Sequence, residues 1–272
     1  MKYLVNGGCS FTANKESWGN LTLPNHETIN VGISGVGNHV ISTRVIEQVF
    51  KMIQNGVPSK DIKVIVQWSG LFRLDLVVDR NLNVPRQISS LPAPIQVDEK
   101  DCPTTWVTDA GRTGFKIWPS VYGVISDEQF FIQTLENILR TEWFLKSNNI
   151  EYRMFTGWDI FTSSEKINRG HLNKNRKTEV TVNQSQFVRA GKYKNIDNKL
   201  FSDIYLWSKP MWDMIDFDKW WFYEDNKIKY GGLQQWVFQN INYKNWYLSD
   251  RDNHPSKLAH QEFFENVIKE IF

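Results

Sequence analysis

The chain contains few cysteines, no marked excess of either charge and no long apolar run. Only Cys9 and Cys102 occur among its 272 residues, too few for a disulfide framework, which favours a reducing cytoplasm. The 32 basic residues nearly balance the 30 acidic ones, so we expect no nucleic-acid partner and no membrane partner. No apolar segment is long enough to cross a bilayer or to form a signal-peptide core, so the expected location is cytoplasmic.

The composition is that of a folded globular chain. Hydrophobic residues make up 41% and charged residues 23%, which excludes a disordered protein. The length suits a single α/β domain over residues 1–272. Aromatic residues are unusually frequent, with 12 Trp, 9 Tyr and 17 Phe. Many of the tryptophans fall in the second half of the chain.

Short apolar segments alternate with amphipathic ones, which predicts a doubly wound parallel sheet with helices on both faces. The strands are expected at 2–6, 28–31, 62–66 and 151–155, and the helices at 40–53, 127–148 and 258–271. Five prolines indicate an insertion of loops at about 79–125. A second insertion, polar at first and then aromatic, is expected at about 160–246.

The first expected strand leads into Gly7-Gly8-Cys9-Ser10-Phe11-Thr12. A serine hydroxyl becomes a nucleophile when a base takes its proton and donors hold the oxyanion that forms. A glycine turn before a helix suits this role, because the first amides of a helix are free. The alternative is a serine that only caps the helix. If the segment is extended, Cys9 should point away from Ser10.

A glycine-rich loop at 30–38 follows the second expected strand and precedes a helix. Its glycines suit backbone amides turned toward an anion. The glycine spacing does not match a dinucleotide-binding loop. The alternative is a turn that only leads into the helix, with Asn38 as its cap.

His254 differs from the other four histidines because carboxylates precede it by two and four positions. A histidine that acts as a general base needs an acceptor on its second ring nitrogen. Asp252 is favoured as this acceptor, since alternate residues of an extended segment face the same side; Asp250 is the alternate. The competing interpretation is an exposed Asp/His turn.

In chain order, Ser10, Gly35, Asn38 and the Asp252/His254 pair resemble the motifs of the SGNH (GDSL-like) hydrolase superfamily. The resemblance implies a flavodoxin-like three-layer α/β/α fold with about five parallel strands. It also implies that Ser10 attacks an ester, that His254 is the base, and that the amides of Ser10 and Gly35 hold the oxyanion. No metal or organic cofactor is implied.

The chain departs from the pattern of that superfamily after the third strand, where Gln67-Trp68-Ser69-Gly70 replaces Gly-x-Asn-Asp. The third oxyanion donor would then be Asn38, Gln67 or Ser69. Cys9 also replaces the aspartate of the nucleophile motif. Loss of one oxyanion donor costs about 3 kcal/mol in other enzymes, so a catalytically silent binding or structural protein is an alternative.

Two further features bear on the substrate. Arg73 could bind an anionic substrate group or pair with a carboxylate. Trp212, Trp221 and Trp236 could stack on a sugar or form a small core of their own. The sequence therefore predicts a serine esterase or deacylase acting on a small-molecule or glycan ester, for instance an O-acetyl group; a sugar O-acyltransferase is the close alternative.

The Gly-Cys-Ser-Phe-Thr motif also resembles the starts of bacteriophage-encoded proteins, which would imply association with a virion. The sequence makes no prediction of oligomeric state.

Overall fold

The computed structural model describes residues 1–71, 73–79, 104–109, 125–163, 199–226, 228–249 and 252–272. Its centre is a four-stranded parallel sheet in the order β2-β1-β3-β6. The strands are β1 (Lys2–Gly7), β2 (His26–Asn30), β3 (Ile62–Trp68) and β6 (Glu151–Thr156). The expected α/β class with a central parallel sheet is confirmed.

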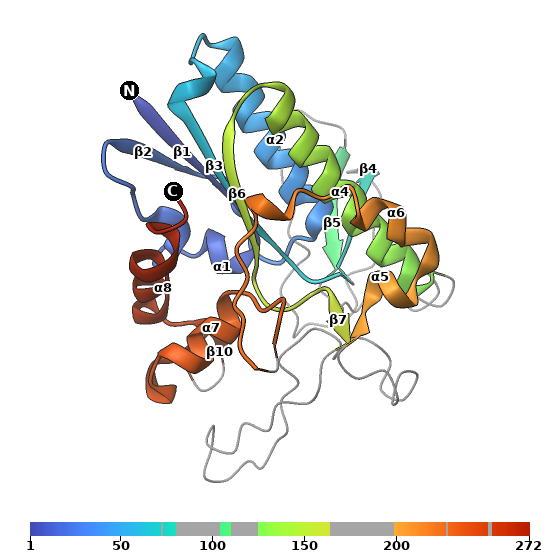
Figure 1. Cartoon of the computed structure of the whole chain (residues 1–272). Coiled ribbons are helices and arrows are strands. Elements are labelled where there is room, and N and C mark those ends of the chain that lie inside the picture. The colour runs from blue at the N-terminus through green and yellow to red at the C-terminus, as the bar shows by residue number, and fades with distance from the viewer. Residues whose placement is uncertain (72, 80–103, 110–124, 164–198, 227, 250–251) are drawn as a thin grey trace.

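Helices cover both faces of this sheet (Figure 1). On one face α2 (Asn38–Gln54) packs beside α4 (Asp127–Ser147). On the other face lies α8 (Lys257–Phe263), which continues as a π-helical turn over Phe264–Ile268. Phe263 of α8 contacts Phe155 of β6, with ring centroids 5.2 Å apart. The arrangement is compatible with a three-layer α/β/α fold.

The sequence favours these elements for simple reasons. The inner strand β3 is almost wholly apolar, as expected of a parallel strand buried on both faces. Helix α4 begins after Ser126, whose hydroxyl accepts the amide hydrogen of Gln129 at 3.1 Å and so caps the helix. Between α2 and α4 the buried hydroxyls of Ser42 and Thr141 bond each other at 2.6 Å, so their burial leaves no polar group unmatched.

In the C-terminal half the hydrophobic core consists largely of aromatic rings, and this part is called here the aromatic core. It lies among the short helices α5 (Phe201–Ile204), η4 (Leu206–Ser208), α6 (Lys209–Trp212) and η5 (Phe217–Lys219). Trp212 is 7% exposed, and its ring lies 5.0 Å from Phe161 and 4.6 Å from Phe217. Aromatic rings bury large areas, so they build a core where aliphatic residues are scarce.

A charge cluster around the buried Glu142 joins this aromatic core to α4. Glu142 is fully buried, and Lys146 reaches both Glu142 at 2.7 Å and Asp216 at 2.9 Å. The hydrogen bond from Lys146 lowers the pKa of Asp216. The backbone amide of Asp216 donates to Glu142 at 3.2 Å. The buried carboxylate is thus compensated by a charge and by an amide, as burial requires.

In the part of the chain that the structure describes, three antiparallel strand pairs lie outside the main sheet. They are β4 (Leu74–Asp79) with β5 (Thr104–Asp109), β7 (Thr162–Ser163) with β8 (Lys199–Leu200), and β9 (Tyr247–Ser249) with β10 (Asp252–Pro255). The prediction of loops throughout 79–125 was wrong at β5, where β-branched and aromatic residues favour a strand. The rest of that insertion, and most of 160–198, lies outside the described residues.

The remaining short helices of the described residues are α1 (Ser10–Ala13), η1 (Trp18–Asn20), η2 (Ser59–Asp61), α7 (Leu233–Asn240) and η6 (Tyr243–Asn245). No helix in the described part of the chain is both long and apolar enough to cross a membrane.

Substitution of Gly232, the residue before α7, tests the close packing of this helix against the end of β6. A Cβ atom at this position would lie 2.1 Å from the carbonyl oxygen of Thr156 at the end of β6. Gly232→Ala should therefore lower the free energy of unfolding by about 1–3 kcal/mol, as overpacking does, measured by urea denaturation. Gln239→Ala, an exposed change in the same helix, is the control and should cost less than about 0.5 kcal/mol. Equal stability of the two variants would contradict this packing.

Candidate active site

The carboxyl edge of the sheet collects the segments that the sequence marks as functional. Strand order reverses at β1, which has β2 on one side and β3 on the other. Ligands of open α/β sheets bind outside the carboxyl ends of strands at such a reversal. Ser10 follows β1, the glycine loop follows β2, and Ser69 follows β3. The fold thus brings these three segments to one place.

Ser10 is the first residue of α1 and is 8% exposed. Its Oγ lies 4.0 Å from Sγ of Cys9. The expectation that Cys9 points away from Ser10 was therefore wrong. It assumed an extended backbone, whereas the chain turns into a helix at Ser10 and brings the two side chains to the same side.

Gln67, at the end of β3, supports the turn that carries Ser10. Its Oε1 accepts the hydroxyl of Thr12 at 3.1 Å and the thiol of Cys9 at 3.5 Å. Its Nε2 donates to the carbonyl of Trp68 at 2.6 Å. Gln67 is fully buried, so these bonds fix the serine turn against the central strand.

The glycine loop lies beside the same turn. The amide of Ile33 donates to the carbonyl of Gly8 at 3.0 Å, so the loop runs along the residues that precede Ser10. Gly35 has a φ angle of +81°, a left-handed conformation that glycine adopts at little cost. The start of the loop thus lies against the segment that leads into Ser10.

Asn38 is the first residue of α2 and not its cap, which is Gly37. Its Nδ2 donates to the carbonyl of Ser69 and to the hydroxyl of Thr134, both at 3.1 Å. Its Oδ1 accepts the amide of Ser69 at 2.8 Å. Asn38 therefore joins α2, α4 and the end of β3, and both of its side-chain hydrogens are engaged. The hydroxyl of Ser69 is buried without a hydrogen-bond partner.

The other end of the chain reaches this edge through β10. The ring of His254 lies edge-on to Phe11, with centroids 5.6 Å apart, and Phe11 is the residue after Ser10. Lys257 also bonds Glu16 at 3.3 Å, which ties the start of α8 to the loop after α1. The backbone of Asp252 lies in β10, but its side chain, like all of Asp250, lies outside the described residues.

Arg73 and Asp75 hold the end of the glycine loop. Arg73 donates to the carbonyl of Val36 at 3.0 Å, and its guanidinium lies 5.6 Å from the ring of Trp158. Asp75 accepts the amide of Gly37 at 2.8 Å and that of Val40 at 3.0 Å. Asp75 was not singled out from the sequence, although its alternation with Arg73 is a signal that both face one side.

Asp75 is almost fully buried, and this burial raises its pKa to about 6, while the amides at the start of α2 oppose the shift. Burial disfavours a charged carboxylate, whereas hydrogen bonds from amides favour it. A second buried carboxyl, Asp159 after β6, behaves in the same way, with a pKa of about 6.

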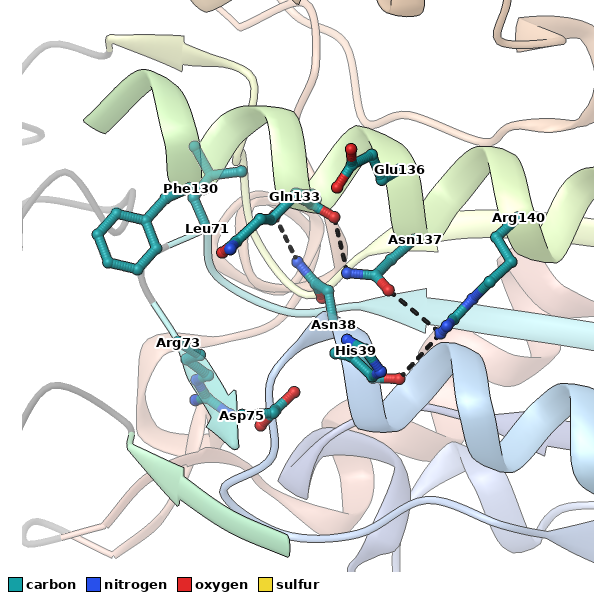
Figure 2. A pocket seen from close by; sticks show the side chains of 11 residues that line it. Asn38, His39, Leu71, Arg73, Asp75, Phe130, Gln133, Glu136, Asn137 and Arg140 are labelled. Carbon is teal, nitrogen blue, oxygen red and sulfur yellow. Dashed lines mark hydrogen bonds between the residues drawn. The ribbon is translucent and has the colours of Figure 1, made fainter. Parts of the chain in front are cut away.

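A cavity of about 260 Å³ opens between α2, α4 and β4 (Figure 2). Polar side chains from α4 reach toward it, among them Gln133 and Asn137, and Asp75 of β4 closes it together with Arg73, which precedes that strand. The cavity is lined by Asn38, His39, Leu71, Arg73, Asp75, Phe130, Gln133, Thr134, Glu136, Asn137 and Arg140. Ser10 and His254 are not among these residues, so the serine turn does not line the cavity.

The three candidate tryptophans pack mainly against other rings. Trp212 belongs to the aromatic core, and Trp236 lies 5.5 Å from Phe263. Trp221, which is half-buried, contacts the same Phe263 at 5.2 Å. The region does reach the carboxyl edge, since the amide of Gln234 donates to the carbonyl of Gly157 after β6 at 2.9 Å.

Among the residues that the structure describes, no group of three or more His, Cys, Asp or Glu side chains is placed to hold a metal ion. No protein-family model matches the sequence, and no curated protein matches it significantly.

Asp75→Asn should change how stability depends on pH. In the wild type the folded carboxyl has a pKa of about 6, above its unfolded value, so the folded state binds the proton more tightly. This contribution is present at low pH and is lost as pH rises through about 6. The stability of wild type relative to Asp75→Asn should therefore be greater at pH 5 than at pH 7.5, by about 1.4 kcal/mol, in urea denaturation.

Asp159 remains in both proteins of this comparison, so its effect cancels. A difference that is constant with pH, or larger at pH 7.5, would contradict the burial of Asp75 as a carboxyl group with a raised pKa.

Trp212→Ala should lower the free energy of unfolding by about 3–5 kcal/mol, because a large ring leaves the aromatic core. The matched control is Trp207→Ala, since Trp207 is 83% exposed and its loss should cost less than about 0.5 kcal/mol. Chemical denaturation of both variants measures the difference. If Trp212→Ala hardly changed the free energy of unfolding, Trp212 would not be a core residue and would again be a candidate for ligand binding.

Proposed function

We propose that the protein is a serine hydrolase of the SGNH (GDSL-like) type that cleaves an acyl ester. The observation that carries the proposal is the contact of Phe11 with His254. Through this contact the residue next to Ser10 meets the histidine from the opposite end of the chain. A nucleophile and a base drawn from these two places, at the carboxyl edge of a parallel sheet, are what the sequence motifs imply.

In this proposal the hydroxyl of Ser10 attacks the acyl carbon while His254 accepts its proton. The proton then passes to the leaving alcohol, and water releases the acyl group by the same steps in reverse order. The sequence assigns the orientation of His254 to Asp252, or alternatively to Asp250. The assignment of Ser10 as the nucleophile is supported by the hydrogen bonds that Cys9 and Thr12 donate to Gln67, because these bonds hold the turn that carries Ser10.

The oxyanion would be held by the amides of Ser10 and Gly35, which belong to adjacent segments. Asn38 is a poor third donor because both of its side-chain hydrogens are already bonded. The hydroxyl of Ser69 is a better one, since it is buried and has no partner. Burial strengthens such a donor, because water does not compete with it.

The proposal leaves the alcohol of the substrate unassigned. A glycan ester, as the tryptophans of the sequence suggested, would need rings open to a ligand, and Trp212 and Trp236 are packed in the interior. Arg73 is already engaged with Val36 and Trp158, so it is better placed to shape the glycine loop than to bind an anion directly.

A fluorophosphonate probe tests the nucleophile. The folded protein should be labelled at one residue, Ser10, because only an activated serine attacks phosphorus readily. Mass spectrometry of the intact and digested protein measures the labelling, and heat-unfolded protein is the control. Ser10→Ala should abolish labelling, and Cys9→Ala should retain it.

Labelling that persists in Ser10→Ala and disappears in Cys9→Ala would make the thiol the nucleophile. A folded protein that takes no label and cleaves no aryl ester would be a binding or structural protein with the same fold.

A further inference from the structure

One peptide group of the glycine loop, between Val36 and Gly37, is held on both sides by charged side chains. Its carbonyl oxygen accepts a hydrogen bond from Nη1 of Arg73 at 3.0 Å. Its N–H donates to Oδ1 of Asp75 at 2.8 Å. Both hydrogen bonds involve a charged partner, which makes them stronger than neutral ones. Arg73 and Asp75 therefore form a clamp that fixes the plane of this peptide group.

The clamp lies in close contact with the loop. A Cβ atom at Gly37 would lie 2.7 Å from Oδ2 of Asp75 and 2.8 Å from the carbonyl oxygen of Arg73. The same Oδ2 accepts the amide of Val40 at 3.0 Å, which ties the clamp to the first turn of α2. Asp75 is buried, so water does not compete for these hydrogen bonds.

The other end of the glycine loop is also fixed. The amide of Gly32 donates to Oδ1 of Asn30 at 2.9 Å, and the amide of Ile33 donates to the carbonyl of Gly8 at 3.0 Å. Between the two fixed ends, the amide of Gly35 donates to no other residue that the structure describes. This amide is thus available to a ligand, and its position is set by the residues on either side.

Arg73 also connects the loop to the serine turn. Its guanidinium lies 5.6 Å from the ring of Trp158, within the range of a cation–π contact. The ring of Trp158 meets that of Phe11 edge-on, with centroids 5.2 Å apart, and Phe11 follows Ser10. Trp158 is 4% exposed. One buried ring therefore separates the side chain that holds the glycine loop from the residue next to the proposed nucleophile.

We propose that Arg73 and Asp75 are positioning residues for the oxyanion site, which keep the amide of Gly35 at the distance from Ser10 that the reaction needs. This inference rests on the proposed function. When Ser10 attacks, negative charge develops on the acyl oxygen, and it returns to a carbonyl when the alcohol leaves. The clamp takes no proton and does not touch the substrate. It matters because a misplacement of about 1 Å can cost about 100-fold in rate.

The first measurement needs no catalysis. Protein made with ¹³C-carbonyl valine and ¹⁵N-glycine shows only the glycine amides that follow a valine, which are those of Gly32 and Gly37. Their hydrogen exchange is then followed by NMR. In Arg73→Met the amide of Gly37 should exchange at least about tenfold faster than in the wild type, because the loop end opens more often. The amide of Gly32, whose acceptor is Asn30, should keep its rate.

The second measurement is turnover of an uncharged aryl ester at a pH well above the pKa of Asp75, which is about 6. Arg73→Met should lower kcat on the order of 10- to 100-fold, part of the loss expected when an oxyanion donor is removed. KM should stay unchanged, because the substrate does not touch Arg73. Arg73→Lys, which restores a donor for the carbonyl of Val36, should recover most of the loss.

Two other variants disturb the clamp in different ways and should lower kcat in the same range. Asp75→Asn has one acceptor oxygen for two amides, and Gly37→Ala pushes the loop away from Asp75. Either variant replaces Arg73→Met if that protein does not fold. The matched control is Ser42→Ala, which removes a buried hydrogen bond between α2 and Thr141. It weakens the same helix without touching the loop, so kcat should not change.

Wild-type kcat in Arg73→Met and Asp75→Asn would overturn the inference. So would a rise in KM alone, because Arg73 would then bind the substrate, and so would an equal loss of kcat in Ser42→Ala, because any loosening of α2 would then suffice. A failure of the proposed function looks different. Wild-type protein would be inert to the ester and to the fluorophosphonate, while the exchange rate of the Gly37 amide would still depend on Arg73.

Discussion

The arrangement of this protein depends on the parallel pairing of β1 with both β2 and β3. Parallel strands end at the same edge of a sheet, so pairing in register places the segments that follow them side by side. The turn with Ser10, the glycine loop and Ser69 are brought to the same edge for this reason. A shift of one residue in the pairing would turn each buried side chain to the opposite face, and the site would be lost together with the core.

The polar residues around the site serve mainly to hold loops in place. Gln67 fixes the serine turn, Asn38 joins α2 to the end of β3, and Asp75 with Arg73 fixes the end of the glycine loop. A catalytic group is effective only when the residues that support it are themselves rigid. The asparagine expected after β3 is missing, but the backbone around the site is held in place by these hydrogen bonds.

The sequence predicted the main sheet well because its strands are short apolar runs between clear turns, as at Ile62–Trp68. Helix α4 was predicted within one residue of its end, since Ser126 caps it at one end and a polar Asn148 follows at the other. The meeting of the two chain ends was predicted from Ser10 and His254. The approach of Cys9 to Ser10 was not predicted, because it depends on the residue at which the helix begins. The burial of Trp212 and the role of Asp75 were not predicted either, because they depend on neighbours far away in the sequence.

The position of α8 also has a consequence for synthesis. Its Phe263 covers Phe155 of β6, Trp221 and Trp236, yet these residues leave the ribosome well before α8 does. Until residues 257–268 emerge, one face of the sheet has an uncovered aromatic surface, and such surfaces attract other chains. Completion of the last helix would therefore both close the fold and end the period in which the nascent chain is most prone to aggregate.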